Sequence, residues 1–127
     1  MGKHVHILIA DDSFSVRHAV RSLLEEMGCD IAEAPNGAQA LSVLRHGNFD
    51  MLITDLQMPE MDGMALVAAV RADSRLKNIP IIMFTLQEAM QEKAFAVGVD
   101  AYICKKEQNT SERLEKTVKE LLKMKEA

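Results

Sequence analysis

Short apolar segments alternate with longer amphipathic segments along the chain. The short segments are rich in β-branched residues and stop at polar residues, whereas the longer ones repeat their apolar residues every three or four positions. The first pattern is typical of buried strands and the second of helices that cover a core. The predicted strands span residues 5–10, 29–34, 51–55, 80–85 and 101–105, and helices are predicted between and after them, the fourth at about 89–97 and the last at about 111–125.

Several helix ends are marked by residues with known end preferences. Asp12 or Ser13 is placed to cap the first helix, and Gly28 is placed to end it. Asp62 is placed to cap the third helix, and Gly98 to stop the fourth. Apart from the last, each predicted helix therefore connects two predicted strands.

Near-continuous apolar strands separated by helices imply a parallel sheet with both faces covered. Right-handed crossovers that place helices on both sides give a doubly wound sheet. We therefore predict an α/β fold, a doubly wound five-stranded parallel sheet with five helices. In such a sheet the functional site lies at the carboxyl ends of the strands, near the point where the winding direction reverses.

Composition narrows the class of protein. The chain has 127 residues, 48% of them hydrophobic, and a formal net charge of −4, with no internal repeat and no linker. We expect a single domain over residues 1–127 that buries a real core. The mild acidity argues against direct binding of nucleic acid, and no apolar run approaches the length of a membrane span. With no signal-peptide pattern and only two cysteines, the expected location is the cytoplasm.

Polar side chains gather where the predicted strands end. If they converge, three carboxylates repel one another unless a cation relieves them, and Mg²⁺ favours such oxygen ligands. One carboxylate can then act as a nucleophile toward phosphorus, while an ammonium and a hydroxyl stabilise the transferred group. The set predicts a phosphoryl-transfer site. Its members are Asp11 and Asp12 after the first strand, Asp55 at the end of the third, Thr85 at the end of the fourth and Lys105 at the end of the fifth.

These residues, with the segment DLQMPEMDG at 55–63, resemble the receiver domain of bacterial response regulators. The resemblance covers about residues 3–125 and implies a flavodoxin-like fold with strand order 2-1-3-4-5. That order puts Cys29 and Cys104 on opposite edge strands, too far apart for a disulfide, so both should be free thiols.

The resemblance also implies a role for each residue of the site. Asp55 would be the phosphoacceptor and would share a Mg²⁺ ion with Asp12, a direct ligand, and with Asp11, which acts through water. The backbone carbonyl of Gln57 would be a further ligand.

Two more residues would contact the phosphoryl oxygens, namely Thr85 and Lys105. Tyr102 would be a switch that turns inward as Thr85 moves. The surface formed by the fourth helix, fifth strand and fifth helix would then change shape for a partner.

As a receiver, the chain would be a phosphorylation-activated switch of a two-component system. A histidine kinase would donate the phosphoryl group, and a downstream protein would be bound, by a monomer or by a phosphorylation-linked dimer. The chain would be no enzyme beyond catalysing its own phosphorylation and dephosphorylation.

Two positions depart from the family pattern. Leu86 replaces the small residue usual after the switch hydroxyl, where it can crowd the site. Lys106 replaces the usual proline after the lysine. A non-proline residue makes a cis peptide costly, so the loop is expected to be trans. Lys106 also puts a second ammonium beside the site, where it either steers anionic donors or is simply solvated.

Three alternatives stand beside this interpretation. The chain ends soon after the last predicted helix, which favours a stand-alone receiver, but it can also be a module cut from a longer regulator or hybrid kinase. A Mg²⁺-dependent aspartyl-phosphate hydrolase would need an acid at position 57, which is Gln57. A nucleotide or flavin carrier would need a glycine-rich loop after the first strand, where residues 11–15 read DDSFS.

Overall fold

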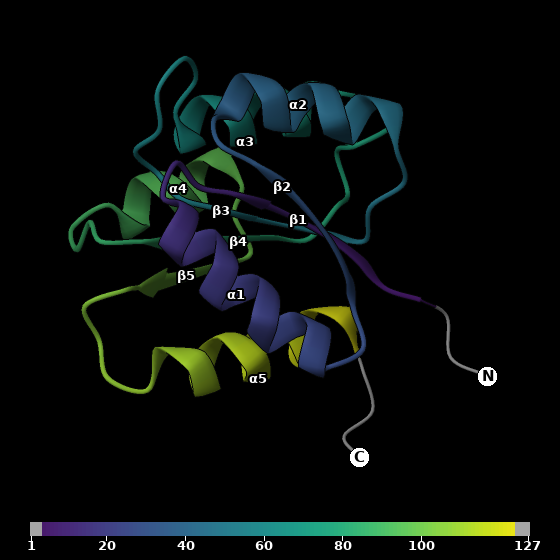
Figure 1. Cartoon of the computed structure of the whole chain (residues 1–127). Helices are drawn as coiled ribbons and strands as arrows, with labels where there is room; N and C mark the ends of the chain where they lie inside the picture. The colour runs from purple at the N-terminus through teal and green to yellow at the C-terminus, as the bar shows by residue number, and fades with distance from the viewer. Residues whose placement is uncertain (1–3, 124–127) are drawn as a thin grey trace.

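A computed structural model describes residues 4–123 of the chain. Within them, five strands and five helices alternate, and all strand pairs are parallel, in the order β2-β1-β3-β4-β5 (Figure 1). The predicted fold class and strand order are therefore confirmed. The strands are β1 His6–Ala10, β2 Asp30–Ala34, β3 Met51–Thr54, β4 Ile81–Thr85 and β5 Ala101–Cys104; the helices are α1 Phe14–Glu26, α2 Gly37–His46, α3 Gly63–Ala72, α4 Gln91–Val97 and α5 Thr110–Leu122.

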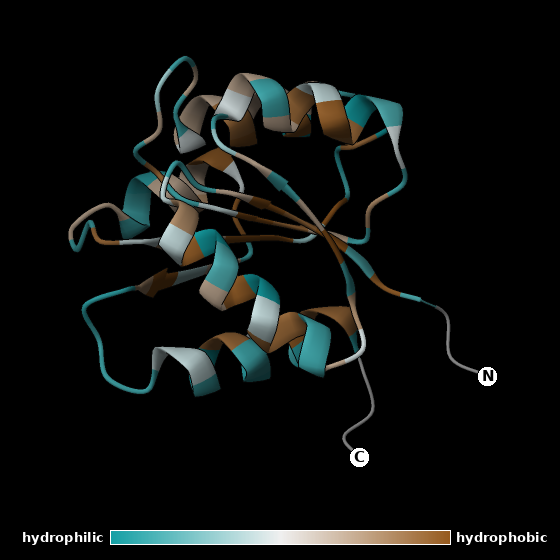
Figure 2. Ribbon diagram, in the orientation of Figure 1, coloured by the Kyte–Doolittle hydropathy of each residue, from teal (hydrophilic) through white to brown (hydrophobic). Residues whose placement is uncertain are grey.

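Helices cover both faces of the sheet because alternate strand residues point to opposite sides. On β1, Leu8 and Ala10 pack in the cluster that includes α2, α3 and α4, whereas Ile7 and Ile9 pack in the cluster that includes α1 and α5. Figure 1 shows α1 and α5 together on one side of the sheet and α2 and α3 on the other. Apolar colour fills the central strands in Figure 2, whereas polar and apolar colours alternate along the helices.

The helix caps follow the predicted chemistry. Of the two candidates for α1, Ser13 is the cap, because its hydroxyl accepts a hydrogen bond from the Val16 amide at 3.3 Å. Asp62 caps α3 through the Ala65 amide at 2.9 Å. Gly28 follows the end of α1 with φ +87°, a conformation that glycine adopts without strain.

Boundary differences are small. The predicted strands extend one residue too far at one end, and α4 begins at Gln91 rather than at residue 89. The last helix begins one residue early, at Thr110, and ends at Leu122; positions 124 and 125 of its predicted span lie outside the described residues.

Both cysteines, Cys29 and Cys104, are buried free thiols, as predicted. Among residues 4–123, no helix has the length and apolar character needed to cross a membrane.

Candidate functional site

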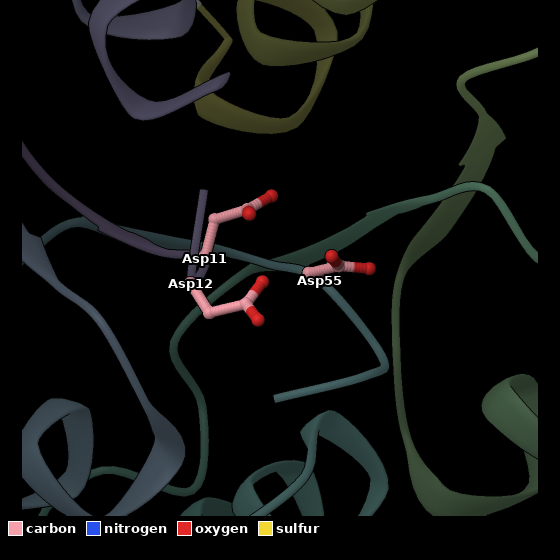
Figure 3. Close-up of side chains that lie close together, drawn as sticks. All are labelled: Asp11, Asp12 and Asp55. Atoms are coloured by element: carbon pink, nitrogen blue, oxygen red, sulfur yellow. The ribbon is translucent and has the colours of Figure 1, made fainter. Parts of the chain in front are cut away.

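The two central strands carry the carboxylates to one place. Ala10 at the end of β1 pairs with Thr54 at the end of β3, so the residues that follow leave the sheet side by side. The Asp55 amide donates to the Ala10 carbonyl at 2.8 Å and fixes this register. Asp11, Asp12 and Asp55 each offer a carboxylate oxygen, and these three atoms lie within 4.8 Å of one another (Figure 3).

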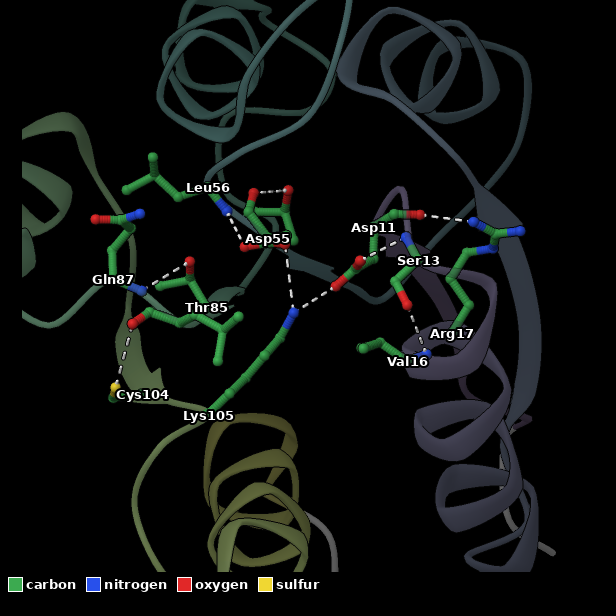
Figure 4. A network of polar contacts seen from close by, with 12 residues as sticks. Asp11, Ser13, Val16, Arg17, Asp55, Leu56, Thr85, Gln87, Cys104 and Lys105 are labelled. Carbon is green, nitrogen blue, oxygen red and sulfur yellow. Dashed lines mark hydrogen bonds and ion pairs between the residues drawn. The ribbon is translucent and has the colours of Figure 1, made fainter.

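Lys105 bridges two of these carboxylates from the end of β5. Its Nζ lies 2.8 Å from Asp11 Oδ2 and 3.3 Å from Asp55 Oδ2 (Figure 4). The Lys105 amide donates to the Thr85 carbonyl at 2.7 Å, which places the chain beyond β5 against the end of β4. The ammonium also lies 5.5 Å from the centre of the Phe84 ring, within range of a cation–π contact. The Lys105 ammonium thus contacts two carboxylates of the three-carboxylate cluster.

Backbone amides hold the same two carboxylates from the other side. Asp11 Oδ1 accepts from the Ser13 amide at 2.9 Å, and Asp55 Oδ1 accepts from the Leu56 amide at 2.7 Å. Burial has the largest effect on the pKa of Asp11 and raises it. The hydrogen bond from Lys105 lowers this pKa, and the negative charge of Asp55 raises it further. A cation bound beside Asp11 would favour the charged form of this carboxylate against the effect of burial.

The site residues line one cavity of about 340 Å³. The cavity opens beside a second groove along residues 56–59, and Gln57 lines both. Every residue predicted to hold the metal or the phosphoryl group contributes to the cavity wall. The wall is formed by Asp11, Asp12, Ser13, Val16, Asp55, Gln57, Thr85, Leu86 and Lys105.

Thr85 and Tyr102 are connected through the loop after β4. Thr85 is buried, and its hydroxyl accepts from the Gln87 amide at 3.4 Å. The half-buried Tyr102 hydroxyl donates to the Gln87 carbonyl at 2.6 Å, and burial raises the pKa of this phenol. Tyr102 is therefore linked to the site through Gln87 and does not itself line the cavity.

The two departures from the family pattern differ in their consequences. Leu86 lines the cavity wall but is 56% exposed, so it stands at the rim. The Lys106 ammonium pairs with Glu88 at 3.3 Å and does not line the cavity. Both side chains are exposed, which agrees with the expectation that this ammonium is simply solvated. No peptide bond within residues 4–123 is cis, as expected for this loop.

Two supporting residues were not predicted from the sequence. Gly63 packs against the backbone of Asp55 so closely that an added Cβ would lie 2.1 Å from the Asp55 carbonyl oxygen. The end of the segment 55–63 contains this glycine, but only the tertiary contact reveals its role. Arg17 reaches back from α1 to the Asp11 carbonyl, with Nη1 at 2.7 Å, and no local sequence pattern signals that contact.

Comparison with known proteins identifies the family of the chain. The family model for the response regulator receiver domain matches residues 7–119. The chain is 43% identical over 102 residues to the chemotaxis protein CheY of Pseudomonas aeruginosa, covering 78% of this chain and 82% of that protein.

Solved structures agree as well. The chemotaxis response regulator CheY4 of Vibrio cholerae has a TM-score of 0.84 at 33% identity, covering 94% of this chain and 99% of that one. The response regulator TrrA of Thermotoga maritima, in complex with Mg²⁺ and BeF, has a TM-score of 0.83 at 30% identity, covering 92% and 98%. The chain therefore belongs to the response regulator receiver domain family, the phosphorylation-activated switches of two-component signalling.

Proposed function

We propose that Asp55 accepts a phosphoryl group from the phosphohistidine of a histidine kinase, in a reaction that requires Mg²⁺. The observation that carries the proposal is the placement of Asp55. One oxygen of this carboxylate is held by an amide, while the group faces two further carboxylates and an ammonium across a cavity. Asp11 is the more deeply buried partner of Lys105, with 4% of its side chain exposed against 12% for Asp55. Asp55 is thus the more accessible of the two to an incoming phosphorus.

The donor set suits a hard divalent cation. The cavity wall carries three carboxylates and one ammonium, which contacts two of them, so negative charge is left uncompensated at a place where burial already raises the pKa of Asp11. We assign Asp12 and Asp55 as direct ligands, Asp11 as a ligand through water and the Gln57 carbonyl as a further ligand. When bound, Mg²⁺ would neutralise charge on the phosphoryl oxygens. The Mg²⁺ and BeF held by TrrA support the binding of Mg²⁺.

The transfer itself is a displacement at phosphorus. A carboxylate oxygen of Asp55 forms the new bond to phosphorus, the bond to the imidazole nitrogen of the donor breaks, and that nitrogen keeps the electron pair. Lys105 leaves Asp55 to hold a phosphoryl oxygen and keeps its contact with Asp11. The Thr85 hydroxyl donates a hydrogen bond to another phosphoryl oxygen. Water later takes the phosphoryl group and restores the Asp55 carboxylate, so the chain catalyses only its own phosphorylation and dephosphorylation.

The signal leaves through the loop after β4. If the Thr85 hydroxyl turns to the phosphoryl group, it can no longer accept from the Gln87 amide, and Gln87 also holds Tyr102. Movement of Gln87 therefore frees Tyr102 on the surface formed by α4, β5 and α5. On that surface Phe95 of α4 is 50% exposed. We propose that a downstream protein binds there.

Intact mass after incubation with acetyl phosphate tests the proposal. Wild type should gain one phosphoryl group with Mg²⁺ and none with a chelator. Asp55→Asn should gain none, whereas Asp30→Asn, a matched change at the opposite end of the sheet, should react like wild type. Undiminished labelling of Asp55→Asn would overturn the assignment of the phosphoacceptor. Equal labelling with and without Mg²⁺ would overturn the metal requirement.

A further inference from the structure

The three carboxylates of the site are not held equally. Asp11 accepts from the Ser13 amide and from Lys105, and Asp55 accepts from the Leu56 amide and from Lys105. Asp12 is exposed, and its carboxylate accepts no hydrogen bond from any group in the described part of the chain. Its position is therefore set by the backbone that carries it, beginning with the peptide between Asp11 and Asp12.

Arg17 fixes that peptide. Its Nη1 donates to the Asp11 carbonyl at 2.7 Å, the oxygen of the peptide unit that leads into Asp12 (Figure 4). A peptide unit is planar, so fixing its carbonyl direction also fixes the direction in which the next Cα leaves. On the other side of Asp11, the amide of the same residue donates to the Ala34 carbonyl of β2 at 3.1 Å. The turn is held at both ends.

The guanidinium is itself held in place. Its Nε donates to Glu33 Oε1 at 2.9 Å, and the Arg17 side chain is only 16% exposed. The second oxygen of Glu33 accepts from Arg21, one turn further along α1. Burial works against the charge of Glu33, but the hydrogen bonds from Arg21 and Arg17 outweigh it and hold the pKa below its usual range. The planar fork of arginine suits such a bridge, because one group contacts two acceptors in fixed directions.

We propose that Arg17 is a positioning residue for the metal site, holding the peptide between Asp11 and Asp12 so that the Asp12 carboxylate faces the cation. The inference rests on the proposed binding of Mg²⁺, and it concerns a residue that touches neither the metal nor the phosphoryl group. Outer contacts of this kind commonly change metal affinity by about ten- to a hundredfold when they are removed.

Charge alone predicts the opposite effect. Removing a cation near a divalent ion relieves repulsion and should tighten binding. Loss of positioning should weaken it. The sign of the change in Mg²⁺ affinity therefore separates the two effects, and a loss of stability alone would produce neither at a temperature where the variant is folded.

The matched control is Arg21→Gln. Arg21 lies on the same helix, carries the same charge and contacts the same Glu33, but its hydrogen bonds go to Glu33 and Glu25 and not to the Asp11 carbonyl. The test is a Mg²⁺ titration followed by the amide NMR shifts of the site, for wild type, Arg17→Gln, Arg17→Lys and Arg21→Gln. Circular dichroism establishes that each variant is folded.

Binding should weaken about tenfold in Arg17→Gln and also in Arg17→Lys, which keeps the charge but loses the fork. Arg21→Gln should stay within about twofold of wild type. Unchanged or tighter binding by Arg17→Gln, or equal weakening by Arg21→Gln, would overturn the positioning role. Should Arg17→Gln fail to fold, Arg17→Lys decides by the same criterion. Absence of saturable shifts in wild type would instead overturn the proposed metal site.

Discussion

Gly63 offers a sharp test of how the fold shapes the site. A change from glycine to alanine at a helix start usually stabilises a protein, but close packing at Gly63 should make this change destabilising. Gly63 is the first residue of α3, where alanine normally stabilises a protein by about 0.4–1 kcal/mol through lower chain entropy. Here the added Cβ would lie 2.1 Å from the Asp55 carbonyl oxygen and 2.9 Å from Leu56 Cα. The first distance is 1.3 Å short of the 3.4 Å at which ordinary contact begins.

The magnitude follows from what must move. Both atoms are backbone, so the clash cannot be relieved by turning a side chain, and the upper part of the overpacking range applies, about 3 kcal/mol. Separating the segments also breaks the hydrogen bond from the Gly63 amide to the Leu56 carbonyl, 2.7 Å in length, which contributes about 1 kcal/mol. Offset by about 1 kcal/mol of entropic gain, Gly63→Ala should lower the free energy of unfolding by about 3 kcal/mol.

Urea unfolding followed by circular dichroism measures this loss. The control is Gly47→Ala, where the nearest atom to the added Cβ, at 2.9 Å, belongs to the Phe49 ring. A ring at the end of a side chain can shift, so this variant should stay within about 1 kcal/mol of wild type. A Gly63→Ala protein as stable as wild type, or more stable, would refute the close packing of α3 on the Asp55 backbone.

Two further substitutions test the charges around the site. Lys105→Met should cost about 3 kcal/mol at neutral pH, because it leaves the buried Asp11 carboxylate unpaired, and saturating Mg²⁺ should recover part of the loss; a loss that Mg²⁺ does not change would contradict the shared role of ammonium and metal. Glu33→Gln should cost about 1 kcal/mol above the ordinary pKa of glutamate, about 4.3. Because the pKa of Glu33 is lowered in the folded protein, its contribution is fully present above the ordinary pKa and is lost as pH falls from there through the folded pKa. The unfolding curves of the two proteins should therefore converge in acid. A difference that persists undiminished at pH 3 would be inconsistent with the ion pairs of Glu33.

Most of the fold could be predicted from the local pattern of hydrophobic and polar residues. Strand boundaries were predictable because β-branched apolar runs stop at residues such as Asp11 and Asp55, where the chain leaves the sheet. That convergence also made the acidic cluster predictable, since the carboxyl ends of parallel strands meet at one edge. The strand order, by contrast, came from the resemblance to receivers and was confirmed by the pairing of β1 with both β2 and β3.

What could not be predicted depends on side-chain direction and distant contacts. The choice between Asp12 and Ser13 as the cap of α1 needed the position of the serine hydroxyl. Lys106 pairs with Glu88, a residue 18 positions earlier, so the sequence around Lys106 does not indicate its partner. The contact of Arg17 with the Asp11 carbonyl likewise depends on the direction of a side chain, which reaches from α1 to the residue after β1.

The central claim is that Asp55, among three neighbouring carboxylates, receives the phosphoryl group. Borohydride reduces an acyl phosphate to an alcohol, so treatment of the phosphorylated protein converts the modified aspartate into homoserine, which peptide mass spectrometry can locate. We predict homoserine at position 55 and aspartate at positions 11 and 12, in protein whose intact mass shows one added phosphoryl group. Homoserine at Asp11 or Asp12, with Asp55 unmodified, would contradict it.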